Sequence, residues 1–137
     1  MYLLDTNTVS YIIKGGYPAL DARLKKVAPS RIAISTITEA ELRYGAARKP
    51  EAVRLHELLK HFLLSVTILP WDSDAAMQYG QMRAFLEQEG RALGNLDMLI
   101  GAHALAANCT LVTHDQAFRR IPKLRVEDWN HLIAPRR

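Results

Sequence analysis

The first residues constrain the fold more than any other stretch of this 137-residue chain. An apolar run over residues 1–4 ends abruptly at Asp5, and polar residues at positions 6–8 separate it from the next apolar-periodic segment. This order predicts a buried strand that leads through a loop into a helix. A strand this short and apolar is expected at the centre of a sheet, and open parallel sheets bind ligands outside the carboxyl ends of their strands. Asp5 therefore lies where chemistry is expected, although capping of the following helix is an alternative role.

Strand-like and helix-like segments alternate along the rest of the chain, without the turn signals of hairpins. Further strands are expected at residues 31–35, 65–69, 110–113 and, as a short fifth strand, 124–126. Helices are expected at residues 8–14, 18–27, 36–48, 51–64, 73–89 and 96–107, with a short helical piece at 116–120. The alternation predicts one α/β domain over residues 1–137, a three-layer α/β/α arrangement with a central, mostly parallel sheet of four or five strands.

Two helix starts and the end of the chain carry specific expectations. Thr36 with Glu39 three residues later matches a capping box, and Asp72 is expected to cap the helix that follows it. The arginine-rich C-terminal tail is expected to fray.

Composition narrows the class of protein. An apolar fraction of 49% and a charged fraction of 23% are those of an ordinary globular protein. The single cysteine, Cys109, rules out a disulfide framework and fits a reducing compartment. Without a signal peptide or a run near the roughly 18 apolar residues of a membrane span, a cytoplasmic location and no membrane contact are expected. The net charge of +4 suits a polyanionic partner, although many basic proteins bind no nucleic acid.

Four acids do not fit the pattern of solvated surface charges. Asp5 and Asp115 each follow a predicted strand at its carboxyl end, so their side chains can converge at one edge of a parallel sheet. Glu41 projects from the apolar side of its helix, roughly opposite to Glu39. A buried carboxylate is costly unless it is paired or bound to a metal, although Glu41 can also reach the boundary with solvent.

The fourth acid, Asp97, stands in the first turn of an almost wholly apolar helix. Favourable charge at a helix N-terminus is the alternative explanation for its position. Four carboxylates in one pocket cannot all stay ionised without a cation, and oxygen ligands favour Mg²⁺, with Mn²⁺ as a substitute. Such a site suits hydrolysis of phosphodiesters.

The histidines and the other catalytic motifs point to no second site. His56 and His61 are five residues apart, a spacing that does not place two ligands on one helix face, and His103 is expected to be a packed core residue. The sequence has no zinc spacing, no evident nucleophilic triad and no glycine-rich phosphate loop.

Four segments in register resemble the PIN-domain ribonucleases, and most closely the VapC toxins of bacterial toxin–antitoxin modules. They are LLDTNT at residues 3–8, ISTITEAELRYGA at 34–46, GNLDMLIGAHA at 94–104 and LVTHDQAF at 111–118, and the ending over residues 121–129 is also similar. The resemblance covers nearly the whole chain and implies the PIN-like form of the three-layer fold. It also implies a Mg²⁺-dependent endoribonuclease, with transfer RNA as a target, that usually forms a homodimer.

The resemblance assigns roles to particular residues. Asp5, Glu41, Asp97 and Asp115 match the acidic metal site, with Asp5 and Asp97 as the direct metal ligands. Asn7 and Thr113 match supporting polar positions, and the position of Asp115 is the most variable in the family. The implied partner is a small VapB-type antitoxin whose tail crosses the active-site groove in a higher hetero-oligomer. Its body is expected to dock on the helix surface around Leu55, Leu59 and Phe62.

Two other functions compete with this interpretation. The start of the chain superficially resembles haloacid-dehalogenase phosphatases, but these need a second aspartate where this chain has Asn7. A non-catalytic RNA-binding module is the other alternative, and the presence of all four acids argues against it.

Overall fold

The computed structural model describes residues 1–130, and the predicted fraying of the arginine-rich tail lies outside these residues. The strands are β1 (Tyr2–Leu4), β2 (Ile32–Ser35), β3 (Thr67–Leu69), β4 (Thr110–Val112) and β5 (Val126–Glu127). They form one sheet in the order β3-β2-β1-β4-β5, and every neighbouring pair is parallel. The predicted parallel sheet is therefore confirmed with five strands, and β1 occupies its centre.

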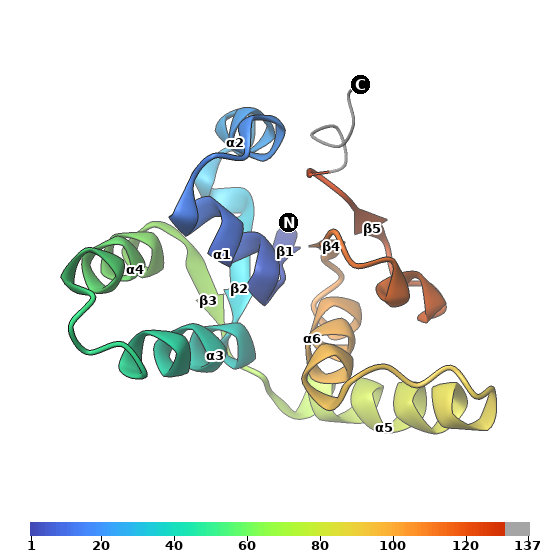
Figure 1. The fold of residues 1–137 in the computed structure, drawn as a ribbon. Coiled ribbons are helices and arrows are strands. Elements are labelled where there is room, and N and C mark those ends of the chain that lie inside the picture. Colours follow the sequence, from blue (N-terminus) through green and yellow to red (C-terminus); the bar gives the residue numbers. More distant parts are fainter. Residues whose placement is uncertain (131–137) are drawn as a thin grey trace.

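Helices cover both faces of this sheet, as Figure 1 shows. The helices are α1 (Thr6–Lys14), α2 (Pro18–Lys25), α3 (Thr36–Ala47), α4 (Val53–Ser65), α5 (Ser73–Gln88) and α6 (Asn95–Ala106). Two short 3-10 turns, η1 (Pro29–Arg31) and η2 (Gln116–Arg120), complete the described elements. No helix within residues 1–130 is long and apolar enough to cross a membrane.

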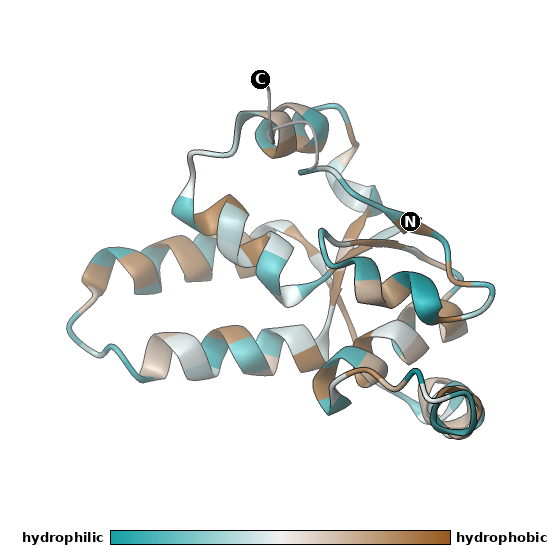
Figure 2. Ribbon diagram, turned by 45° about the vertical axis from the view of Figure 1, so that its right-hand side comes forward, coloured by the Kyte–Doolittle hydropathy of each residue, from teal (hydrophilic) through white to brown (hydrophobic). Residues whose placement is uncertain are grey.

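The alternation of side chains along the central strands creates the two cores. Leu3 and Leu111 point to one face, where they pack with residues of α5, α6 and η2. Leu4 and Val112 point to the other face, where they pack with residues of α1 to α4. Both faces of β1 and β4 are thus apolar, as expected for a parallel sheet between two helix layers. Figure 2 shows the hydrophobic residues of the strands between the helices.

Several element boundaries differ from the predicted ones. Helix α1 begins at Thr6 rather than at residue 8, because the Asp5 carboxylate accepts a hydrogen bond from the Thr8 backbone N–H. Helix α4 continues to Ser65, so β3 begins two residues later than predicted. The fifth strand lies at residues 126–127 rather than 124–126, where it pairs with β4.

The capping box predicted at Thr36 is wrong, whereas the cap at Asp72 is confirmed. Ser35 is the N-cap of α3, and its hydroxyl accepts a hydrogen bond from the Ile37 backbone N–H. Glu39 instead forms an ion pair with Arg43 one turn further along, at 2.9 Å. The Asp72 carboxylate accepts from the Ala75 N–H, at 3.1 Å.

The two-sided burial of β4 predicts a large cost for truncating it. Leu111 is 0% exposed, so Leu111→Ala should lower the free energy of unfolding by about 2–5 kcal/mol. Met77→Ala on α5 is the control, because Met77 is 58% exposed and its truncation should change stability by less than about 0.5 kcal/mol. Urea denaturation at a fixed protein concentration measures both. Equal effects would contradict the placement of β4 between two layers.

Candidate active site

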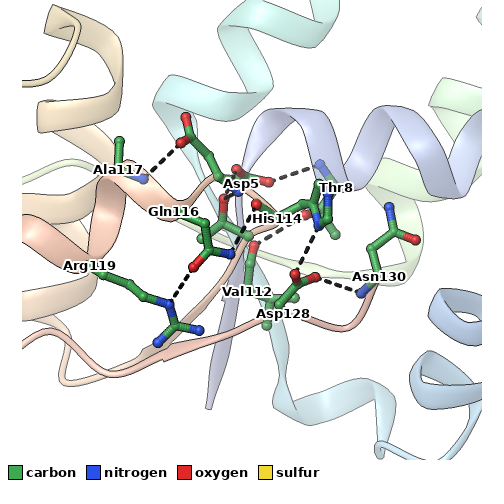
Figure 3. A network of polar contacts seen from close by, with 11 residues as sticks. Asp5, Thr8, Val112, His114, Gln116, Ala117, Arg119, Asp128 and Asn130 are labelled. Atoms are coloured by element: carbon green, nitrogen blue, oxygen red, sulfur yellow. Dashed lines mark hydrogen bonds and ion pairs between the residues drawn. The ribbon is translucent and has the colours of Figure 1, made fainter. Parts of the chain in front are cut away.

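The centre of the site is Asp5, which follows β1 directly and is 5% exposed. Its Oδ1 accepts from the Thr8 backbone N–H at 2.9 Å, and its Oδ2 accepts from the Thr113 hydroxyl at 2.6 Å. Figure 3 shows Asp5 between the start of α1 and the end of β4. The capping role of Asp5 is therefore real, but two hydrogen bonds leave part of the roughly four acceptor positions of a carboxylate unused. Capping and metal binding are compatible at this residue.

Thr113 links Asp5 to Asp115. The Thr113 side chain is 1% exposed, and its hydroxyl donates to Asp5 while accepting the Asp115 backbone N–H at 3.0 Å. Asp115 is itself exposed and caps η2 by accepting from the Ala117 N–H at 2.9 Å. The same short segment after β4 thus orients one buried and one exposed carboxylate.

Glu41 approaches from α3. It is half-buried, and its Oε1 accepts a hydrogen bond of 2.5 Å from the Thr6 hydroxyl at the start of α1. Glu39, on the same helix and also half-buried, instead pairs with Arg43. The two glutamates therefore have different partners, and only Glu41 is held beside the residue that follows Asp5.

Asp97 completes the group from the first turn of α6. Burial raises the pKa of the Asp97 carboxyl, and the negative charges of Asp115, Asp5 and Glu41 raise it further. The field of a helix N-terminus favours an ionised carboxylate, which is the opposite direction from this shift, so that field alone does not explain the environment of Asp97. The structure thus brings all four predicted acids into one electrostatic environment.

The site carries an excess of negative charge that the described residues do not neutralise. None of the four acids forms an ion pair with a Lys, Arg or His side chain within residues 1–130. No three His, Cys, Asp or Glu side chains in this part of the chain lie close enough together to hold a metal ion. The four carboxylates therefore act on one another electrostatically without forming a ready-made set of three ligands, and a cation would have to draw them inward. Their all-oxygen donor set fits a hard divalent cation.

Two polar residues next to Asp5 have environments that the sequence did not indicate. Asn7 lies exposed in the first turn of α1, and its side chain has no hydrogen-bond partner within residues 1–130. Thr6, which the sequence analysis overlooked, bridges to Glu41 and lies 3.2 Å from the buried Thr38 hydroxyl. The available signal was the spacing of Thr38 and Glu41, three residues apart and so on one side of a helix.

His103 is a core residue, as expected, and is held away from the four acids. His103 is 3% exposed, and its Nδ1 lies 2.8 Å from the Ser35 hydroxyl oxygen. Burial lowers the pKa of the His103 imidazole, which favours the neutral form. The prediction that His103 is a packed core residue is confirmed.

The raised pKa of Asp97 predicts how metal-free stability depends on pH. Because the folded-state pKa lies above the unfolded value of about 3.9, stability from this group is full below that value and is lost as pH rises through the folded pKa. Asp97→Asn should therefore stabilise the protein in EDTA at neutral pH, and its advantage should shrink as pH falls toward about 4.

Urea denaturation in EDTA at several pH values between about 4 and 8 measures the difference in free energy of unfolding between Asp97→Asn and the wild-type protein. Asp74→Asn removes an exposed acid from the first turn of α5 and controls for the change of net charge. If the stabilisation by Asp97→Asn is the same at every pH, or grows as pH falls, then burial and repulsion by neighbouring carboxylates do not destabilise the ionised form of Asp97.

Comparison with known proteins identifies relatives of the whole chain. The PIN domain family model matches residues 2–124. The Ribonuclease VapC2 of Rickettsia felis is 38% identical over 132 residues, covering 95% of this chain and 98% of the relative. The tRNA(fMet)-specific endonuclease VapC of Salmonella typhimurium is 36% identical over 129 residues, covering 93% and 97%.

Solved structures agree with the sequence relatives. The crystal structure of Rickettsia felis VapBC2 bound to a promoter DNA fragment matches with a TM-score of 0.88 at 38% identity, covering 93% of this chain and 98% of that chain. VapBC-5 of Mycobacterium tuberculosis, a member of the VapBC family of toxin–antitoxin systems, matches with a TM-score of 0.69 at 25% identity, covering 92% and 94%. With a family model over most of its length and relatives aligned almost end to end, this chain belongs to the PIN domain family, among the VapC-type ribonucleases.

Proposed function

We propose that this protein is an endoribonuclease toxin that cuts RNA with a divalent metal ion bound at the carboxyl edge of its sheet, and that a cognate antitoxin neutralises it. The observation that carries the proposal is that four acids lie near one another without a cationic partner: burial raises the pKa of Asp97, the charges of Asp115, Asp5 and Glu41 raise it further, and no Lys, Arg or His side chain of the described residues pairs with any of the four. An acidic pocket in a chain of net charge +4 suits a nuclease, because Lys and Arg hold the RNA backbone while the carboxylates hold the metal.

The residues of the site have separate tasks in this mechanism. Asp5 and Asp97 would hold Mg²⁺, or Mn²⁺ in its place, and Glu41 and Asp115 would complete the shell or orient the attacking water. A metal bound there would neutralise charge on the phosphate and on the leaving oxygen. Thr113 fixes the Asp5 carboxylate by its hydrogen bond of 2.6 Å, and Asn7 lies exposed beside Asp5, where it is available to the scissile phosphate.

Arginines beside the acids suit contact with RNA. Arg119 and Arg120 are exposed on η2, directly after Asp115. We assign them to the RNA backbone, since guanidinium groups bind phosphates in a bidentate geometry. Two relatives, from Salmonella typhimurium and Shigella flexneri, are named tRNA(fMet)-specific endonucleases, so tRNA(fMet) is the first substrate to test. The proposed place of action is the cytoplasm, where such RNA is found.

A groove of about 860 Å³ between α1, α3 and α4 is the proposed antitoxin site. Leu55 and Leu59 line it as expected, whereas Phe62 packs against the core and is not a lining residue. Thr6 and Glu41 lie in the same lining, so a segment bound in the groove would reach the acids. A basic side chain of that segment would pair with the carboxylates and exclude the metal. Homodimers, joined by antitoxin into a larger assembly, are the proposed quaternary form.

Two alternative functions, a haloacid-dehalogenase phosphatase and a non-catalytic RNA-binding module, are less well supported. Membership of the PIN domain family removes the haloacid-dehalogenase interpretation. A non-catalytic RNA-binding module would not need four unneutralised acids in one place, since each of them repels the RNA backbone.

Removing either proposed metal ligand should abolish cleavage while the protein stays folded. Asp5→Asn and Asp97→Asn each take away one negative charge from a crowded group, so neither should unfold the chain. The measurement is the single-turnover rate on tRNA with Mg²⁺, alongside circular dichroism. A near wild-type rate for either variant would show that the site is elsewhere.

The two glutamates of α3 provide a matched comparison. Glu41→Gln should reduce the cleavage rate strongly, because Glu41 lies beside the acids, whereas Glu39→Gln should lose only a surface ion pair with Arg43. Both variants are assayed on the same RNA at saturating Mg²⁺. An equal loss, or a greater loss at Glu39, would contradict the assignment.

A further inference from the structure

Among the hydrogen bonds that the described residues make to the four acids, the one from the Thr6 hydroxyl to Glu41 is the shortest. The hydroxyl oxygen lies 2.5 Å from Glu41 Oε1, within the range of charge-assisted O–H···O⁻ hydrogen bonds. The bond joins the first residue of α1 to the middle of α3, across 35 positions in sequence. It is therefore a tertiary contact that depends on the packing of the two helices.

A second threonine sets the direction of this hydrogen bond. Thr6 Oγ1 lies 3.2 Å from Thr38 Oγ1, and Thr38 is fully buried. A hydroxyl has one proton, and an ionised carboxylate only accepts, so the Thr6 proton goes to Glu41 and the Thr38 hydroxyl donates to Thr6. The result is a short chain of hydrogen bonds that ends on the carboxylate.

The bond matters because a glutamate side chain is long and flexible. Fixing such a side chain costs rotamer entropy, and a hydrogen bond to a charged group offsets that cost. Glu41 also lines the apolar groove between α1, α3 and α4. Without Thr6 its carboxylate is free to turn along this groove and away from Asp5 and Asp97.

We propose that Thr6 is a positioning residue that holds the Glu41 carboxylate at the acidic site and so raises its affinity for divalent metal. The inference rests on the proposed function, and it assigns a role to a residue between Asp5 and Asn7 that does not itself touch the metal. Hydrogen-bond partners of metal ligands typically contribute 10–100-fold to metal affinity or activity.

The test is Mn²⁺ titration of the RNA-free protein by calorimetry, followed by cleavage kinetics. Thr6→Val keeps the branched shape but removes the hydroxyl, and it should weaken Mn²⁺ binding about 10-fold and lower kcat with little change in KM for RNA. Thr6→Ser keeps the hydroxyl and should restore both quantities.

Thr36→Val is the matched control. Thr36 is the first residue of α3, as Thr6 is of α1, and its hydroxyl accepts a tertiary hydrogen bond from the Trp71 backbone N–H at 3.2 Å. Thr36→Val should lower stability about as much as Thr6→Val while leaving Mn²⁺ affinity unchanged. An equal loss of Mn²⁺ affinity in both variants would overturn the inference, because a general loosening of the helices would then explain it.

A double-mutant cycle separates this inference from the proposed function. If Thr6 acts through Glu41, Thr6→Val should have no further effect in a Glu41→Gln background. Weakened metal binding in Glu41→Gln with wild-type binding in Thr6→Val, or additive losses in the double variant, would overturn the inference alone. Wild-type metal binding in Glu41→Gln would overturn the inference and would leave Glu41 only the proposed role of orienting the attacking water.

Discussion

The Asp5 carboxylate accepts one hydrogen bond from the first turn of α1 and another from Thr113 beyond β4. Both bonds exist because β1 lies at the centre of the sheet with β4 as its parallel neighbour. The carboxyl ends of the two strands then stand side by side, and the groups that follow them meet. A single buried acid therefore joins the central strand, the first helix and the loop after β4, and the proposed chemistry takes place at that junction.

Repulsion among the acids is the cost of this arrangement. Burial and three neighbouring carboxylates raise the pKa of Asp97, and the described residues supply no cationic partner. A structural ion-pair network would have placed Lys or Arg among these acids. Leaving them unneutralised destabilises the metal-free protein and creates affinity for a cation, which is a familiar relation between stability and function at active sites.

The parts of the structure that depend on local pattern were predictable from the sequence. Alternating apolar strands and amphipathic helices indicate a parallel sheet between two layers, and Asp5, Asp97 and Asp115 stand out because each follows or begins a buried element. Boundaries failed where a side chain competes for the backbone. Ser35 rather than Thr36 caps α3, and Asp5 extends α1 by two residues.

The supporting hydrogen bonds were not predictable in the same way. The contact between Thr6 and Glu41 depends on how α1 and α3 cross, which no local pattern encodes. The position of Asn7 was predicted through family resemblance, and the structure places it at the exposed rim without a partner among the described residues. Sequence therefore indicates which residue types gather at the edge of the sheet, whereas packing decides which of them touch.

A crystal structure of the protein soaked with Mn²⁺ tests the central claim most directly. The account predicts an anomalous density peak bound by the carboxylates of Asp5 and Asp97, with Glu41 still hydrogen-bonded to Thr6. A peak bound elsewhere in a protein that cleaves RNA only with metal would contradict it.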